Sequence, residues 1–216
     1  MFGRRHRVEL DGTIAAAGFA SGDRFVVGVW DSGPLGAMTD VMWADPDGKR
    51  TLLASGADVA AFVAGVYDFD AVVVLPIEVR SGTGRIEINA GELKLALDGG
   101  EPLRVFRLRP RWLARSTMWG RIEDALLRPL VGRVVLGGAE GVRAYGVSPA
   151  GVREWYRIYA YRPVVAATAR VDGRDLGALR PLQPPARFGF SEFPRRPALV
   201  RCSPVLEGAE RFLLER

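Results

Sequence analysis

Hydrophobic and polar positions alternate over most of the first hundred residues, in short runs separated by turn residues. The run "DRFVVGVW" (23–30) is almost continuously apolar and β-branched, as expected of a strand covered on both faces. Asp-Pro-Asp-Gly (45–48) separates two such runs, and its proline presets one turn torsion while its glycine supplies a positive φ. We therefore predict a β-hairpin here and a second one at Asp172-Gly173.

A helical period interrupts this alternation twice. Four apolar residues predict one short amphipathic helix over 58–67, with Ser55 or Asp58 available to cap it: Val59, Phe62, Val63 and Val66. A similar period between Pro110 and Val131, closed by Pro129 and Gly132, predicts one or two further helices.

The layout as a whole predicts a mainly β protein. About a dozen strands at short, regular spacing favour an antiparallel β-sandwich or barrel with one or two short helical insertions. We expect a single β-rich domain over 1–216, and if the chain forms two lobes, their boundary falls within 105–133. The proline-rich tail from 181 to 204 carries aromatic anchors, so an ordered, extended course is expected there.

The stretch "GVREWYRIYAYRP" (151–163) reads as a strand whose apolar face holds a carboxylate. One face carries Glu154 between Val152 and Tyr156, and the other carries Trp155 among arginines and tyrosines. Asp40 likewise shares a strand face with Met38 and Met42 in "MTDVMWA". Two acids are thus expected on faces that otherwise look buried.

The scarcity of histidine and cysteine excludes several chemistries. His6, the single histidine, lies near an N-terminus expected to be frayed, so a histidine-dependent hydrolase is excluded. Cys202 is the single cysteine, which excludes an intramolecular disulfide and a cysteine zinc site and indicates a small core residue. No phosphate-binding glycine motif is present; "LGGAEGV" (136–142) joins two β runs. We expect no metal and no cofactor.

Carboxylate chemistry remains open. Burial raises a carboxyl pKa, so Asp40 and Glu154 are candidates for a general acid and base. The competing interpretation, which we weigh more heavily, pairs each acid with an arginine or with backbone amides. Aromatic side chains with a few polar groups also line small-molecule pockets, and the candidate lining residues are Trp30, Trp43, Trp155 and Tyr156.

Basic charge is concentrated in one segment. The chain has a net charge of +5, with 28 arginines and two lysines, and eight of the arginines lie between 104 and 133. Four of them define a candidate basic patch: Arg107, Arg109, Arg111 and Arg115. We interpret this segment as a solvated face and expect neither nucleic acid nor a membrane surface as a partner, because the aromatic residues are not interleaved with the charges. A homodimer stays open.

The location predicted from the sequence is the cytoplasm. The run "TIAAAGFA" (13–20) imitates a signal peptide, but Glu9 and Asp11 stand where its apolar part should begin.

Several motifs resemble known families. "RFVVGVWDSGPLGAMTDVMWADPDGKRTLLA", "FVAGVYDFDAVVV", "GVREWYR" and "FGFSEFPRRP" resemble a family of uncharacterised proteins from high-GC Gram-positive bacteria, which implies no activity. The many-stranded layout, with its W-D and V-D-G-R-D-L-G turns, is remotely similar to the two-lobed, lipocalin-like barrels that include carotenoid hydratases and tocopherol cyclase. This resemblance favours a lipocalin-like barrel and identifies no catalytic residue.

Three functions are therefore carried forward in order. The first is binding of an apolar or aromatic small molecule in the pocket predicted above. The second is a cofactor-independent isomerase, hydratase or cyclase that uses Asp40 and Glu154. The third is a structural or interaction protein whose arginine-rich segment docks an acidic partner.

Overall fold

The structure, a computed structural model, describes residues 5–104, 143, 145–189 and 191–209. Its N-terminal half contains β1 (Arg5–Glu9), β2 (Asp11–Phe19), β3 (Arg24–Ser32), β4 (Met38–Ala44), β5 (Arg50–Ala54), α1 (Ala57–Ala64), β6 (Ala71–Val74), β7 (Ile77–Gly82), β8 (Arg85–Ala90) and β9 (Leu93–Gly99). The remainder contains β10 (Tyr145–Val147), β11 (Arg153–Val171), β12 (Arg174–Asp175), β13 (Leu179–Arg180) and β14 (Ala198–Ala209).

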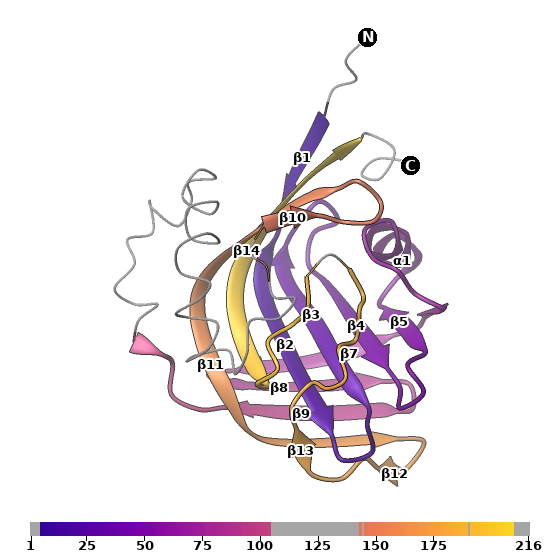
Figure 1. Cartoon of the computed structure of the whole chain (residues 1–216), viewed down its shortest axis with the longest axis vertical. Helices are drawn as coiled ribbons and strands as arrows, with labels where there is room; N and C mark the ends of the chain where they lie inside the picture. Colours follow the sequence, from indigo (N-terminus) through magenta and orange to yellow (C-terminus); the bar gives the residue numbers. More distant parts are fainter. Residues whose placement is uncertain (1–4, 105–142, 144, 190, 210–216) are drawn as a thin grey trace.

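The strands form one large, strongly curled sheet. Ten of them follow one another in the hydrogen-bonded order β6-β5-β4-β3-β2-β14-β11-β9-β8-β7. Only Leu75 and Pro76 separate the two edge strands β6 and β7 in the chain, so the sheet bends until its two edges come near each other. The result is a half-barrel in which β8 and β9 run across the direction of β2 to β4 (Figure 1). The predicted mainly β fold is confirmed.

One strand pair departs from the predicted antiparallel pattern. β5 and β6 are parallel, with Thr51 opposite Ala71 and Ala54 opposite Val74. A parallel pair needs a crossover connection, and α1 supplies it. The helix predicted over 58–67 is this crossover. Gly56 is its N-cap and no side chain caps it, since the Ser55 hydroxyl instead accepts a long contact from the Thr39 amide.

Each face of the sheet packs into its own apolar cluster. The helix-side cluster contains Val26, Trp30, Met38 and Val200 together with Phe62 of α1. The barrel-side cluster is enclosed between the other face and β7–β9, and it includes Phe25, Val27, Val41, Ile88 and Leu95. Because alternate residues of β3 enter different clusters, the strand is buried on both faces, as its nearly continuous apolar run predicted.

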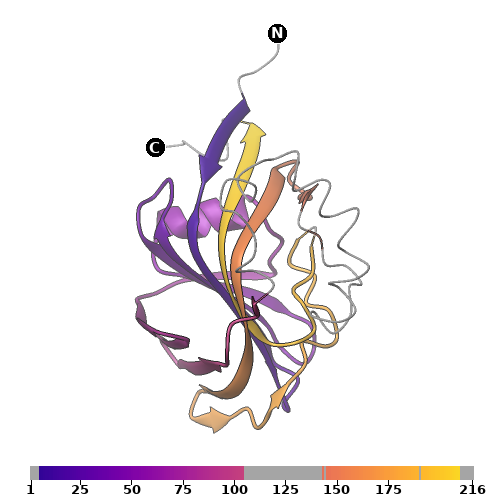
Figure 2. The same ribbon diagram turned by 90° about the vertical axis from the view of Figure 1, so that its left-hand side faces the viewer.

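β11 is the longest strand, and it joins the two parts of the sheet. Residues 153–163 pair with β14 and residues 164–171 pair with β9. The two strands β11 and β14 lie side by side along the height of the molecule, with β1 beside the upper end of β14 (Figure 2). A bulge between Ile158 and Ala160 shifts the register, so Tyr161 enters the same helix-side cluster as Tyr156.

Both predicted hairpins are present. The Asp45 carbonyl accepts from the Gly48 amide at 3.1 Å, and Gly48 has φ +88°. At the second turn, Asp172 and Gly173 both have positive φ and connect β11 to β12. The predicted helices between 110 and 131, the glycine run 136–142 and the suggested lobe boundary lie outside the described residues.

Three terminal segments are more ordered than, or differently ordered from, their sequence prediction. His6 lies in β1 opposite Gly208, so this part of the N-terminus is not frayed. The run 13–20 that imitates a signal peptide forms most of the central strand β2. The proline-rich tail is extended over 181–197, where Leu182 and Phe188 pack into the helix-side cluster, and it then enters β14.

Candidate functional site

The most unusual polar group in the helix-side cluster is a carboxyl flanked by two tyrosines, which we name the Glu154 triad: Glu154, Tyr67 and Tyr156. The Tyr67 hydroxyl donates to Oε2 of Glu154 at 2.7 Å, and the Tyr156 hydroxyl lies 3.0 Å from the same oxygen. The two hydroxyl oxygens are themselves 2.6 Å apart. Three oxygen atoms therefore form a closed triangle.

The surroundings of the triad disfavour charge. Glu154 is fully buried, and this burial raises the pKa of its carboxyl to about 7, although the hydrogen bonds from the tyrosines pull in the opposite direction. Burial also raises the pKa of both tyrosine hydroxyls. Oε1 of Glu154 is buried without a hydrogen-bond partner among the described residues. A buried acceptor in this state can bind a donor from a ligand or a water molecule.

Local sequence explains how each member of the triad reaches this place. Glu154 and Tyr156 are two residues apart in β11, so both side chains leave the same face of the strand. Tyr67 follows α1, and its amide donates to the Val63 carbonyl at 3.0 Å. Its ring passes against Gly189, where a Cβ atom would lie 2.6 Å from Cδ1 of Tyr67. A larger residue at 189 would displace the ring.

The second candidate acid, Asp40, has a different partner. Its Oδ1 accepts from the Trp30 indole at 3.0 Å, while Oδ2 is buried without a partner among the described residues. Burial raises the pKa of Asp40 to about 7, against the effect of the Trp30 hydrogen bond. Gly28 lies between β2 and β4, and a Cβ there would be 2.5 Å from Oδ1 of Asp40 and 2.5 Å from the Trp30 indole nitrogen.

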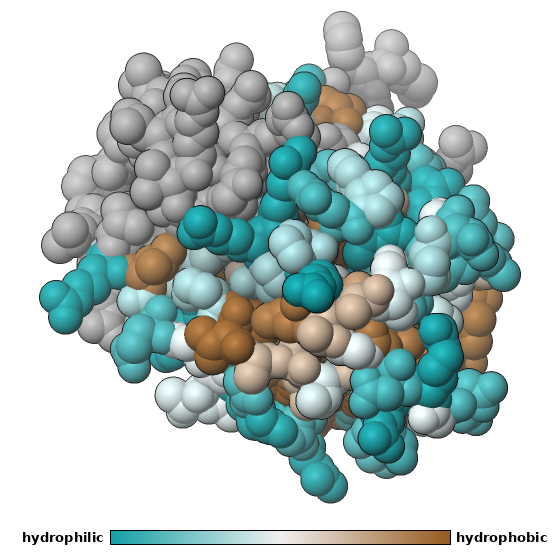
Figure 3. All heavy atoms as spheres, turned by 60° about the horizontal axis from the view of Figure 1, so that its bottom comes forward, coloured by the Kyte–Doolittle hydropathy of each residue, from teal (hydrophilic) through white to brown (hydrophobic). Residues whose placement is uncertain are grey.

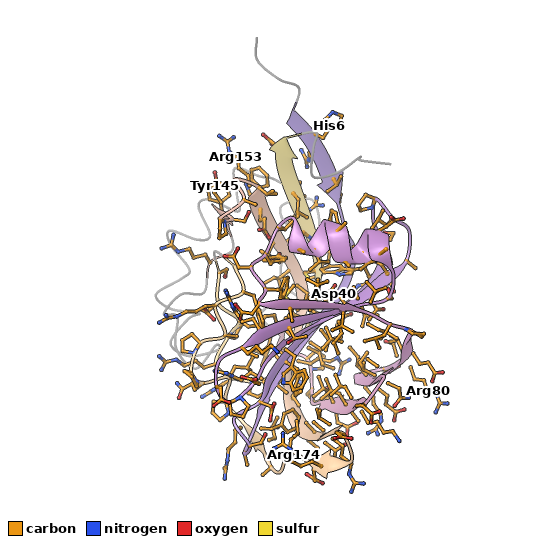
Figure 4. The ribbon with its side chains drawn as sticks, turned by 90° about the vertical axis from the view of Figure 1, so that its right-hand side faces the viewer. His6, Asp40, Arg80, Tyr145, Arg153 and Arg174 are labelled. Atoms are coloured by element: carbon orange, nitrogen blue, oxygen red, sulfur yellow. The ribbon has the colours of Figure 1, made fainter. Side chains whose placement is uncertain are left out.

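The structure does not bring the two acids together. They lie on the same face of the sheet, but β3, β2 and β14 separate β4 from β11 in the strand order. Neither carboxyl contributes to the pKa shift of the other. Figure 4 shows Asp40 near the middle of the molecule, whereas Arg153, the neighbour of Glu154 in the chain, lies towards the end marked by His6. Shared acid and base action by this pair therefore has no support in the geometry.

The predicted pocket residues divide between different surfaces. Trp30 and Tyr156 belong to the helix-side cluster. Trp43 packs on the barrel-side cluster, where it stacks on Phe25 and donates to Asp23 at 2.8 Å. Trp155 points away from the triad and contacts the Tyr145 ring, with centroids 5.4 Å apart. The four residues do not line one pocket.

Arginine pairing does not explain the two buried acids in the described part of the chain. Their printed partners are tyrosine and tryptophan side chains. The buried arginines serve backbone carbonyls instead: Arg24 donates to the Pro184 carbonyl at 2.8 Å, and Arg157 donates to the Ser203 carbonyl at 2.9 Å. Arg157 also forms an ion pair with Glu9. Arg107, Arg109, Arg111 and Arg115 lie outside the described residues.

Cys202 has the environment of a core residue. Its side chain is buried in the helix-side cluster, and burial raises the pKa of the thiol to about 12. The neutral thiol is a poor nucleophile, because the thiolate is the reactive form. Within the ranges that the structure describes, no three His, Cys, Asp or Glu side chains gather where they could hold a metal ion, and no helix is long and apolar enough to cross a membrane.

Sequence reasoning missed Tyr67. The residue was placed only at the end of a predicted helix, and its hydroxyl meets a carboxyl 87 positions further along the chain. The apolar stripe of α1 indicated which side of the helix faces the sheet, but no local pattern reports which distant strand lies opposite its end.

Comparison with known proteins gives only remote structural similarities. No model of a known protein family matches the sequence, and no curated protein sequence matches it. A solved structure described as an AttH from Nitrosomonas europaea is similar at 13% identity and a TM-score of 0.28, over 94% of this chain and 51% of that one. This chain therefore spans about half the length of that protein.

A second solved structure, an acetoacetate decarboxylase from Legionella pneumophila, is similar at 7% identity and a TM-score of 0.36. The similarity covers 94% of this chain and 83% of the other. The resemblance predicted from sequence is thus met only at a coarse level, that of curled β-sheet proteins. The resemblance to a family of high-GC Gram-positive bacteria stays a prediction.

Proposed function

We propose that this protein binds an apolar or aromatic small molecule at the rim of the helix-side cluster. The observation that carries the proposal is Oε1 of Glu154, a buried acceptor without a described partner in apolar surroundings. Small-molecule sites combine such surroundings with a few polar groups that fix orientation. The curled β-sheet is compatible with this role.

Apolar side chains that are only partly buried surround the triad. They pack on the helix-side cluster from the turn after α1, from β11, from the segment after β9 and from the 181–197 tail; among them are Tyr67, Phe69, Leu103, Tyr156, Ile158 and Phe193. An apolar ligand that covered this rim would remove their exposed surface from water, which is favourable. Access to the buried carboxyl would pass along Tyr67 and Tyr156, because both contact it and both reach solvent.

Native mass spectrometry of the freshly purified protein, followed by denaturing extraction, tests this function. A reproducible small-molecule adduct is expected. An environment-sensitive naphthalene dye should also bind, and Tyr156→Ala should weaken its binding several-fold because part of the rim is lost. Val165→Ala is the matched control, since Val165 is 67% exposed and lies in the same strand away from the triad. A bare mass together with no dye binding would contradict the proposal, as would equal weakening by both substitutions.

Acid–base catalysis is the second candidate, favoured by one observation. The Glu154 carboxyl has its pKa raised to about 7, which suits proton transfer near neutral pH, and two hydroxyls lie beside it. In this hypothesis Glu154 and the tyrosines act without Asp40, as an isomerase, hydratase or cyclase. The test is turnover of the extracted adduct: a rate that changes near pH 7 and disappears in Glu154→Gln supports catalysis, whereas an unchanged compound supports binding alone.

Docking of an acidic partner through the arginine-rich segment remains the third hypothesis. Binding of this kind should weaken as salt screens the charges.

A further inference from the structure

The hydrogen atoms available to the Glu154 triad define its charge. Three oxygen–oxygen contacts of 2.6, 2.7 and 3.0 Å close the triangle of Tyr156, Tyr67 and Glu154. Each tyrosine hydroxyl has one hydrogen, and an ionised carboxylate has none. With Glu154 ionised, the three groups hold two hydrogens for three contacts, and one pair of oxygens would meet through lone pairs alone.

A neutral carboxyl completes the triangle. With its proton on Oε2, Glu154 donates to one tyrosine oxygen, that tyrosine donates to the second, and the second donates back to Oε2. This arrangement leaves Oε1 as the carbonyl oxygen of the acid, which can only accept. Oε1 is also the atom that is buried without a partner among the described residues.

We propose that the ligand of this site is an alcohol or a phenol whose hydroxyl donates to Oε1 of a neutral Glu154. The inference rests on the proposed function and deepens it by naming the class of ligand. A ligand carboxylate would set its lone pairs against those of Oε1, and no described arginine contacts the triad to compensate its charge. An ether or a hydrocarbon of the same shape would leave the buried acceptor unsatisfied.

Three naphthalene derivatives test this selectivity: 2-naphthol, its methyl ether and 2-naphthoate. Their dissociation constants are measured by isothermal titration calorimetry at pH 6. For the unmodified protein we expect 2-naphthol to bind about tenfold more tightly than the ether, because satisfying a buried acceptor has an effect of this order. 2-Naphthoate should bind most weakly.

Two substitutions locate the selectivity at Glu154. Glu154→Gln keeps an acceptor oxygen in a neutral side chain of the same shape, so the preference for naphthol over the ether should persist. Glu154→Leu removes the acceptor, so the ratio should fall to about one. If the leucine variant does not fold, the infrared band of a protonated carboxyl gives a second measurement: it should be present in the unmodified protein, absent in Glu154→Gln, and shifted by 2-naphthol.

The outcomes separate the two proposals. If the ether binds as tightly as 2-naphthol, or the ratio survives in Glu154→Leu, the hydroxyl inference is wrong while apolar binding stands. An absent carboxyl band in the unmodified protein also overturns it. If none of the three compounds binds up to millimolar concentration, the proposed function itself is contradicted.

Discussion

Buried carboxyls make the stability of this protein depend on pH. The pKa of Glu154 is raised from an ordinary 4.5 to about 7, so between these values the folded state holds more protons than the unfolded state. The free energy of unfolding should therefore fall as pH rises through this window, by about 3 kcal/mol in total for this carboxyl. Asp40, raised to about 7 from 3.8, acts in the same direction.

Urea unfolding at pH 5, 6, 7 and 8 measures this effect. Glu154→Gln cannot ionise, so its stability should fall less steeply with pH than that of the unmodified protein. Glu78→Gln is the control, because Glu78 is exposed in β7 and its replacement should leave the slope unchanged. Parallel curves for the unmodified protein and Glu154→Gln would show that Glu154 is ionised over the whole range or is not buried.

Gly28 is required by the close approach of Asp40 and Trp30. A Cβ at this position would lie 2.5 Å from an atom of each side chain, so Gly28→Ala must separate the indole from the carboxyl or shift a central strand. We expect a loss of about 2 to 3 kcal/mol in the free energy of unfolding, typical of an overpacked core.

Gly82→Ala is the matched substitution in a strand, because a Cβ there has open space. Chemical unfolding of both variants, followed by tryptophan fluorescence, gives the comparison. Equal stabilities would contradict the tight contact at Gly28.

At the scale of elements, the turns are the parts that local chemistry determines most fully. Gly48 ends the Asp-Pro-Asp-Gly turn between β4 and β5 with φ +88°, and a Cβ there would touch nothing. Gly48→Ala should therefore destabilise the protein through backbone strain alone, by about 1 kcal/mol. Urea unfolding measures this, with Gly82→Ala as the reference for glycine replacement at an ordinary φ. A neutral Gly48→Ala would mean that the turn adopts another conformation in solution.

The element that sequence reasoning described least well is β11. Its alternation correctly placed Val152, Glu154 and Tyr156 on the buried face, because side chains of a strand alternate with period two. The same alternation assigned Tyr161 to the opposite face and failed at the bulge after Ile158. A bulge is set by how two strands match in register, which the sequence of one strand does not contain.

At the scale of the whole molecule, the curled sheet leaves one apolar edge open. Three consecutive valines of the edge strand β6 are 41% to 52% exposed: Val72, Val73 and Val74. Figure 3 shows apolar residues reaching the surface in the middle of the end where β7–β9 lie, framed by hydrophilic side chains. Exposed edge strands of this composition promote association between chains.

Val74→Lys should reduce aggregation on heating, because a charge on an edge strand opposes pairing with another chain. Val74 is 52% exposed, so the midpoint of thermal unfolding should change little. Static light scattering during a temperature ramp is the measurement. Val165→Lys adds the same charge at a residue that is 67% exposed in β11, a strand paired on both sides. If both variants aggregate alike, net charge and not the β6 edge controls association.

The sequence by itself determined the features that depend on neighbours in the chain. The two hairpin turns, the helix between β5 and β6, the doubly buried β3 and the alternating faces around Glu154 all follow from residue type and spacing over a few positions. These features are set by backbone torsions and by the periods of strand and helix, which act locally.

Only the tertiary structure decided which groups meet. It paired Glu154 with Tyr67 across 87 positions, gave Asp40 the Trp30 indole, and placed the two acids on strands too far apart in the sheet to act as a pair. It also placed Trp43 and Trp155 on surfaces away from Tyr156. The physical reason is that these contacts depend on strand order, curl and register, which arise from the packing of the whole sheet and leave no local pattern in the sequence.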